Sequence, residues 1–294
     1  MRRLSLIILL CLIAITTVEA QLLYKISGNG LEKPSYIFGT YHFASEKFVD
    51  EVPGLRDVLE SVEQVCGEVA SNFDQQEMLK RMLMPDGLTY NQLLDAEHYE
   101  KLNAKLRMFL GADLTSAYIG QNLSSLNPAA MSLMLQMLEP ADVPNADLRT
   151  PLDPYFDKYA KLMGMPSLFL ETQEFQLEVF FGASIEEQVA ELVWWLDNYQ
   201  NSSLLVQEMV QAYMAQDIEQ ATKCFDSQLK SGMYSKKWQE RAIDQRNKNW
   251  VELMPSIMAD KSTLFYVGLA HLDYGKNSLF RLLRKAGYTV TPLL

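Results

Sequence analysis

The sequence predicts an α/β fold in which a mixed central sheet carries a large helical insertion. Short runs of apolar, β-branched and aromatic residues bounded by turn residues occur near both ends of the chain. Stretches with helical periodicity lie between these runs. From about residue 75 to 150, apolar residues recur at helical spacing with little that alternates like a strand. We therefore expect one domain over residues 21–294, interrupted by a helical insertion at about 75–150.

Residues 1–20 have the pattern of a secretory signal peptide. Arg2 and Arg3 precede a short apolar stretch, which ends in small residues before Ala20. The apolar stretch is too short to span a bilayer comfortably, and no later segment comes near that length. We expect cleavage after Ala20, a mature chain without a transmembrane segment, and export to the periplasm or the medium.

The composition limits the partners and the chemistry. The formal net charge of −11 makes nucleic acid an unsuitable partner, because a polyanion would be repelled. Only Cys66 and Cys224 follow the signal peptide, so there is no Cys-x-x-Cys motif for zinc or redox chemistry. The two thiols either pair or lie buried. With 48% apolar residues, the chain can bury a full core.

The elements before the insertion follow from local patterns. Residues 22–27 and 35–38 are predicted strands, and Gly28-Asn29-Gly30 between them is typical of a hairpin turn. Residues 54–63 carry apolar side chains on one helical face, and residues 64–69 form the next predicted strand.

After the insertion, a strand at 167–170 precedes a mainly helical stretch. Helices are expected at 174–181, 185–199, 203–215, 218–230 and 236–258, and the chain closes with a strand at 263–267, a helix at 276–286 and a strand at 288–292. Trp194 and Trp195 are adjacent and cannot both face one core. One of them should meet another helix or a second copy of the chain, which leaves a homo-oligomer open.

Two of the three histidines occupy the same local pattern. His42 and His271 each stand three residues after a glycine that follows a predicted strand, in Gly39-Thr40-Tyr41-His42 and Gly268-Leu269-Ala270-His271. A glycine lets the backbone turn sharply at the strand end, which is where open α/β sheets place their ligands. The two imidazoles are therefore candidates to share one metal ion. The alternative is an ordinary histidine, partly buried and hydrogen-bonded in a loop.

Two acidic residues also follow predicted strands. Glu68 ends the strand after the first histidine, and Glu171 follows residues 167–170 in the same way. Either carboxylate could complete a metal's ligands or act as a general base, because oxygen beside two imidazoles suits zinc, manganese or cobalt. Alternatively, each caps a following helix or meets water.

Arg246 stands out by its helical position. The apolar stripe of residues 236–258 runs through Trp238, Ala242, Trp250, Leu253 and Ile257, and Arg246 falls in its middle, with Asn247 and Asn249 flanking the stripe. A buried guanidinium is costly unless it meets an anion. Arg246 is therefore a structural partner of Glu68 or Glu171, or a substrate clamp, unless its side chain reaches past its neighbours to the surface.

These motifs together resemble one known family. Tyr36-Ile37-Phe38-Gly39-Thr40-Tyr41-His42 and the strand ending in Glu68 are similar to the opening of the TraB/GumN family, to which Tiki-type metalloproteases are related. Further similar segments follow in order: 152–156, 164–172, Gln176-Leu177, Arg246-Asn247 with Trp250, 267–272 and 282–290.

The resemblance implies an α/β fold with inserted helices and a divalent-metal, peptidase-like activity. His42, Glu68 and His271 match the family's presumed active-site positions, and Arg246 matches another recurrent position. The family is heterogeneous, and a more distant group of relatives binds haem. One departure follows His271, where many members have glycine and this chain reaches it only at Gly275.

The leading hypothesis is an exported hydrolase that depends on manganese, cobalt or zinc and cleaves peptide or amide bonds. Its site residues are His42, His271 and Glu68 as metal ligands and Glu68, Glu171 and Arg246 in catalysis, acting on a peptide or small-molecule substrate. A periplasmic binding protein for haem or a small ligand is the alternative. A third hypothesis is an interaction protein that uses its helical insertion.

Overall fold

The protein is built on one mixed sheet of six strands. The computed structural model describes residues 21–72, 74–138 and 150–293. The strand order is β4-β3-β5-β2-β1-β6. The strands are β1 (Leu23–Gly28), β2 (Ser35–Thr40), β3 (Gln64–Gly67), β4 (Ser167–Phe169), β5 (Thr263–Gly268) and β6 (Tyr288–Pro292). The predicted signal peptide lies outside the described residues, and so does the last part of the predicted insertion, residues 139–149.

Four neighbouring strands run parallel. β4 pairs with β3, β3 with β5, and β5 with β2, each in parallel, whereas β1 is antiparallel to both β2 and β6. The predicted hairpin between β1 and β2 is confirmed. Gly28, Asn29 and Gly30 all have positive φ, and the Leu31 N–H donates to the Gly28 carbonyl at 3.0 Å.

Helices form most of the rest of the described chain. They are α1 (Leu55–Ser61), α2 (Gln75–Met82), α3 (Tyr90–Leu93), α4 (Ala96–Leu110), α5 (Ile119–Ser124), α6 (Pro128–Leu138), α7 (Asp153–Met163), α8 (Gln173–Phe181), α9 (Ile185–Met214), α10 (Ile218–Ser231), α11 (Lys236–Gln239), α12 (Gln245–Asp260) and α13 (Leu279–Lys285). Short 3₁₀ turns occur at Glu46–Asp50 and Leu269–His271. No described helix is long and apolar enough to cross a membrane.

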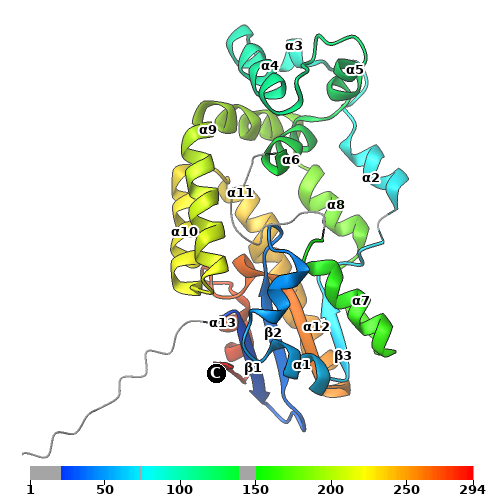
Figure 1. Ribbon diagram of the computed structural model, residues 1–294, viewed down its shortest axis with the longest axis vertical. Helices are drawn as coiled ribbons and strands as arrows, with labels where there is room; N and C mark the ends of the chain where they lie inside the picture. The colour runs from blue at the N-terminus through cyan, green and yellow to red at the C-terminus, as the bar shows by residue number, and fades with distance from the viewer. Residues whose placement is uncertain (1–20, 73, 139–149, 294) are drawn as a thin grey trace, which may run out of the picture.

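The helical insertion has a core of its own. In Figure 1, α3 to α5 lie at the opposite end of the molecule from the sheet, and the long α9 runs between the two ends. Buried residues of α4 and α6 pack there against part of α9, which follows the insertion in the sequence; they include Leu102 and Met131, and α9 contributes Trp195. A separate, larger core surrounds the sheet. α/β architecture with a helical insertion is therefore what the structure shows.

The tryptophan pair is divided between two surroundings. Trp195 is buried in the core of the insertion, while Trp194 is partly buried with its indole nitrogen beside Gly232, just after α10. The second contact expected from the sequence is thus made by another helix of the same chain.

Two helices differ from the sequence-based expectations, and the structure also decides between the two alternatives for the cysteines. Residues 185–199 and 203–215, predicted as two helices, form the single helix α9; neither glycine nor proline interrupts it, and Ser202 is fully buried. α7 was not expected, although Pro154 sits in its first turn and Gly164 ends it in the left-handed conformation. Cys66 and Cys224 are both free and buried, so the disulfide alternative is wrong.

The predicted helix 236–258 contains a π-helical turn at Glu240–Asp244, between α11 and α12. Ala242, Arg246, Trp250, Met254 and Met258, spaced four apart, are buried, and so are Ile243, Asp244 and Asn247, whereas Leu253, expected in the stripe, is 45% exposed.

Candidate functional site at the strand ends

Most of the candidate residues lie at one edge of the sheet, where the parallel strands end. Thr40 of β2 is in register with Gly268 of β5, and Gly67 of β3 is in register with Tyr266 of β5. His42, Glu68 and His271 follow directly after these three neighbouring strands. The structure therefore delivers all three to the same edge, as the strand-end argument predicts.

Arg246 of α12 is the centre of the cluster. Its Nη2 donates to Glu68 Oε2 and, at 2.7 Å, to Glu171 Oε1, and its Nε donates to Glu171 Oε2 at 2.9 Å. Nη1 lies 3.2 Å from Nε2 of His271 and 3.3 Å from the Ala242 carbonyl. The guanidinium is only 4% exposed. The sequence left open whether Arg246 pairs with Glu68 or Glu171, and it pairs with both.

Glu171 is fully occupied by donors. Besides the two bonds from Arg246, it accepts the Trp250 indole N–H at 3.1 Å and the Gln176 amide at 3.2 Å. Burial raises the pKa of Glu171, against the effect of Arg246. Each oxygen already has two donors, so this carboxylate has little capacity left for a substrate or a proton. Its geometry is that of an anchor that holds Arg246 in place.

Glu68 keeps more of its capacity. Oε1 accepts the Gly268 N–H at 2.7 Å, and Oε2 accepts from Arg246. Burial disfavours its charge, but Arg246, together with that N–H, outweighs burial and lowers the pKa of Glu68 to about 2. Oε1 lies 3.9 Å from Nε2 of His271. Glu68 is thus an ionised carboxylate beside the histidine, and it has fewer donors than Glu171.

His271 is held neutral inside the cluster. Burial, and then the positive charge of Arg246, lower its pKa to about 3. Nδ1 lies 2.7 Å from Oδ1 of Asn247, and the ring lies against Trp250 with centroids 4.4 Å apart. Nε2 faces Arg246 and Glu68. A neutral imidazole nitrogen in this position can act as a base or a metal ligand.

His42 differs from His271 in its surroundings. Its side chain is 75% exposed, and Nδ1 lies 3.5 Å from Oδ2 of Asp153, the first residue of α7. The other oxygen of Asp153 accepts the Thr40 hydroxyl at 2.6 Å, which fixes the carboxylate at the end of β2. The contact with Asp153 raises the pKa of His42 above its ordinary value. His42 is therefore oriented by a carboxylate and open to solvent.

The two motif glycines lie in close packing and do not have a special backbone angle. Neither Gly39 nor Gly268 has a positive φ. A Cβ on Gly39 would stand 2.7 Å from Leu272 Cδ1, and a Cβ on Gly268 would stand 3.3 Å from Glu68 Oε1. The expectation of a sharp glycine turn is thus replaced by a close approach of the loop after β5 to its neighbours.

Two residues of the cluster received no role from the sequence. Asp153 orients His42, and Asn247 contacts His271. Asp153 opens α7, which the sequence pattern does not predict, and Asn247 only flanks the apolar stripe in the sequence. The available signals were a carboxylate directly before Pro154 and a buried amide beside the buried Arg246.

The candidate residues do not form a closed metal centre as they stand. Among the described residues, no group of three or more His, Cys, Asp or Glu side chains has a spacing that could hold a metal ion. Yet the donors are of the kinds that divalent metals take, since both histidines have Nδ1 engaged by an oxygen and Nε2 left for another partner. Metal binding would require Arg246 to give up Nε2 of His271.

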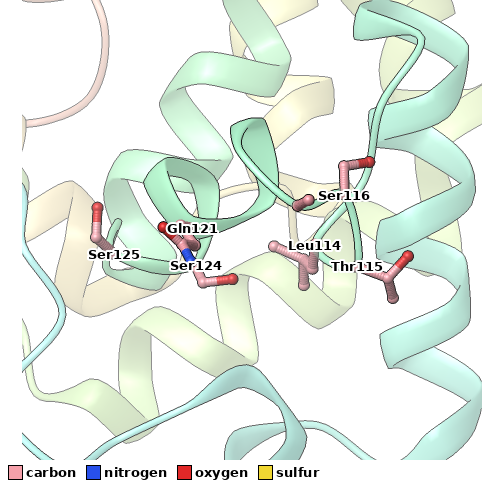
Figure 2. Close-up of a pocket in the computed structure, with 7 residues that line it drawn as sticks. Leu114, Thr115, Ser116, Gln121, Ser124 and Ser125 are labelled. Carbon is pink, nitrogen blue, oxygen red and sulfur yellow. The ribbon is translucent and has the colours of Figure 1, made fainter.

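A pocket lies in the insertion, apart from this cluster. It has a volume of about 500 Å³ and is lined by Leu114, Thr115, Ser116, Ala117, Gln121, Ser124 and Ser125 (Figure 2). None of the candidate site residues lines it. Thr115 and Ser116 also direct their hydroxyls to Asp113.

The chain belongs to the TraB/PrgY/gumN family. The family model matches residues 22–292, nearly the whole chain, including every strand of the sheet and every residue of the cluster. No curated protein and no solved structure matches it.

Proposed function

We propose that this protein is an exported hydrolase that uses a divalent metal, manganese, cobalt or zinc, to cleave peptide or amide bonds. The observation that carries the proposal is the buried, neutral His271, whose Nε2 faces an ionised Glu68 and a fixed Arg246. Groups held at different protonation states side by side are characteristic of sites for acid–base chemistry.

The residues have separable roles in such a reaction. Glu68 is ionised, and its oxygens retain capacity to accept a hydrogen bond from water, which would orient that water. Arg246 can stabilise negative charge that develops on a carbonyl oxygen through its positive charge, and through the Nη1 hydrogen that would be released if a metal took Nε2 of His271. Glu171 keeps the guanidinium oriented through two parallel hydrogen bonds. His42 stands at the solvent side, where a substrate would enter.

The metal would be held by His42, His271 and Glu68. When bound, it would supply a Lewis acid that polarises the carbonyl and makes water more acidic. Asp153 and Asn247 engage the Nδ1 atoms of the two histidines. Ligand histidines are commonly oriented by such an oxygen partner.

Export rests on the sequence of residues 1–20, with Arg2 and Arg3 before a short apolar stretch. Fractionation of cells that express the full chain tests this part. The protein should appear outside the cytoplasm with Gln21 as its first residue. An uncleaved chain in the cytoplasm would contradict it.

Metal binding is tested on the mature chain with a matched histidine control. Titration with manganese, cobalt and zinc should show about one ion per chain, and the double variant His42→Ala/His271→Ala should lose it. The third histidine, His98, lies in the insertion between Asp95 and Asp197. His98→Ala should bind metal as the unmodified protein does. Equal binding by all three proteins would contradict the proposal.

Catalysis is tested with a peptide library on the metal-loaded protein. Cleavage should require the metal and fall at least a hundredfold in Glu68→Gln, which removes the charge but keeps the size. Absence of cleavage with every metal, or full activity of Glu68→Gln, would refute the hydrolase.

One observation favours the binding-protein alternative. Arg246 already donates to both carboxylates and faces His271, so the polar groups of the cluster have partners without an added cation. Haem binding would give a Soret band that His42→Ala or His271→Ala removes. A colourless protein that ignores added haem would exclude that ligand.

A further inference from the structure

Asn247 is a fully buried amide that contacts the site histidine and the loop behind it. Its Nδ2 donates to the carbonyls of His271 at 3.2 Å and Asn277 at 2.9 Å, and its Oδ1 lies 2.7 Å from Nδ1 of His271. Asn247 lies on α12, next to Arg246.

The orientation of this amide is determined by its neighbours. Carbonyl oxygens only accept hydrogen bonds, so the atom that faces the two carbonyls must be the NH₂ group. A flipped amide would place Oδ1 against two carbonyl oxygens in a site without exposure to water. Oδ1 therefore points at the imidazole.

The protonation of the ring follows from that orientation. Oδ1 of Asn247 carries no hydrogen, so the 2.7 Å contact requires the hydrogen on Nδ1 of His271. In a neutral imidazole, Nε2 then has the free lone pair. The opposite side of the ring agrees, because Nη1 of Arg246, which can only donate, lies 3.2 Å from Nε2.

We propose that Asn247 is the positioning residue of His271: it fixes the Nδ1–H tautomer, directs the Nε2 lone pair toward Glu68 and Arg246, and ties the loop of residues 271–277 to α12. The other tautomer would set two acceptors against each other at Nδ1 and two donors at Nε2. The amide oxygen fixes the tautomer, and the amide nitrogen holds the loop.

The tautomer leaves only one nitrogen of His271 available to the site. Only the Nε2 lone pair can take a proton or a metal at the strand ends, because Nδ1 points away to Asn247. The inference rests on the proposed function in one respect, namely that the Nε2 lone pair binds a metal or a proton during catalysis. The tautomer itself is a property of the protein alone.

The test is nitrogen NMR of the metal-free mature chain labelled with ¹⁵N-histidine, at pH 8. The chain has 3 histidines, so His42→Ala and His98→Ala assign the signals of His271. Unmodified protein should show a protonated Nδ1 and an unprotonated Nε2. A spectrum with the proton on Nε2 would overturn the proposal, even if no Asn247 variant folds.

Variants then separate the two jobs of the amide. Asn247→Ala removes the acceptor at Nδ1 and leaves only Arg246 at Nε2 to favour the Nδ1–H tautomer, so the Nε2–H tautomer should become measurably populated. Asn247→Asp keeps an oxygen for Nδ1–H but has no NH₂ for the loop carbonyls, so Nδ1 should stay protonated. Asn249→Ala is the matched control, since Asn249 lies two residues along α12 and accepts a hydrogen bond from Gln245. An unchanged tautomer in Asn247→Ala would also overturn the proposal.

Metal titration of the same variants distinguishes this inference from the proposed function. If the chain binds a metal, Asn247→Ala should weaken binding by about 10–100-fold, the usual effect of losing such a partner. If the chain shows the Nδ1–H tautomer but binds no metal, the metallohydrolase fails and the role of Asn247 stands. If the chain binds a metal but shows the Nε2–H tautomer, the role of Asn247 fails and the metallohydrolase stands.

Discussion

Replacing Arg246 by methionine should destabilise the protein by about 3–5 kcal/mol at neutral pH, the usual cost of removing one partner of a buried ion pair. The change removes the bonds to Glu68 and Glu171 and the contact with His271, and methionine fills much of the space of the side chain. Two carboxylates would remain with no charged partner.

The lowered pKa of Glu68 reflects the same interaction together with the Gly268 N–H and the nearby histidines. Its ordinary value of 4.5 falls to about 2 in the folded protein. A shift of this size corresponds to roughly 3 kcal/mol of stabilisation, which is present above pH 4.5 and lost as the pH falls toward 2. Without Arg246, burial raises the pKa of Glu68 instead, and proton uptake relieves part of the cost. The difference between variant and unmodified protein should therefore be smaller at pH 6 than at pH 8.

Urea unfolding followed by circular dichroism at these two pH values measures both effects. The matched control is Arg241→Met, because Arg241 is 26% exposed and bonds the Val179 carbonyl and Glu187. We expect the control to lose about 1 kcal/mol or less. A loss in Arg246→Met no larger than in Arg241→Met, or a loss that does not depend on pH, would refute the reasoning about buried charge.

The histidines, one motif glycine and the two thiols give the remaining predictions. The free energy of unfolding should fall as the pH drops below 6.5, because His271 binds a proton there in the unfolded chain but only near pH 3 in the folded protein. Urea unfolding from pH 8 to 5.5 measures this, and His271→Gln should remove the contribution. An unchanged pH dependence in His271→Gln would contradict it. His98→Gln should act with the opposite sign, because the pKa of His98 is raised and its stabilisation is lost as the pH rises. Gly39→Ala should lower the melting temperature by an amount equivalent to about 1 kcal/mol or more, because the new methyl group would clash with Leu272 and Leu269. An unchanged melting temperature would show that the loop after β5 moves aside without cost. Cys66 and Cys224 should not react with a thiol reagent in the native protein, and both should react after denaturation. Both thiols are buried, and burial raises the pKa of Cys66 to about 12. Fast reaction of either thiol in the native protein would contradict this.

The strands and most helices could be predicted from the sequence because their signals are local. The hairpin turn at Gly28-Asn29-Gly30 and the apolar runs before His42 and His271 need no knowledge of distant residues. The boundaries within α9 and the π-helical turn before α12 could not be predicted in this way. Ser202 looks like a polar break in the sequence, but tertiary packing buries it inside one continuous helix.

The sequence also gathered His42, Glu68, Glu171, Arg246 and His271 as candidates, each from its own short segment. The sequence could not predict which of these residues contact one another. Glu68 and Glu171 have the same pattern, a carboxylate after a strand, yet Glu171 is enclosed by four donors and Glu68 remains beside His271. That difference depends on where Trp250 and Gln176 lie, and both come from other helices.

The sequence by itself determined the α/β class, the helical insertion and the strand-end position of the two histidines, because hydrophobic periodicity and turn residues act over a few neighbouring positions. Only the tertiary structure decided that Arg246 bridges both carboxylates, that Asp153 faces His42 and that Asn247 sets the proton on His271. These contacts join residues 24 to 178 positions apart. They form because burial leaves each polar group with the partners that the fold brings to it.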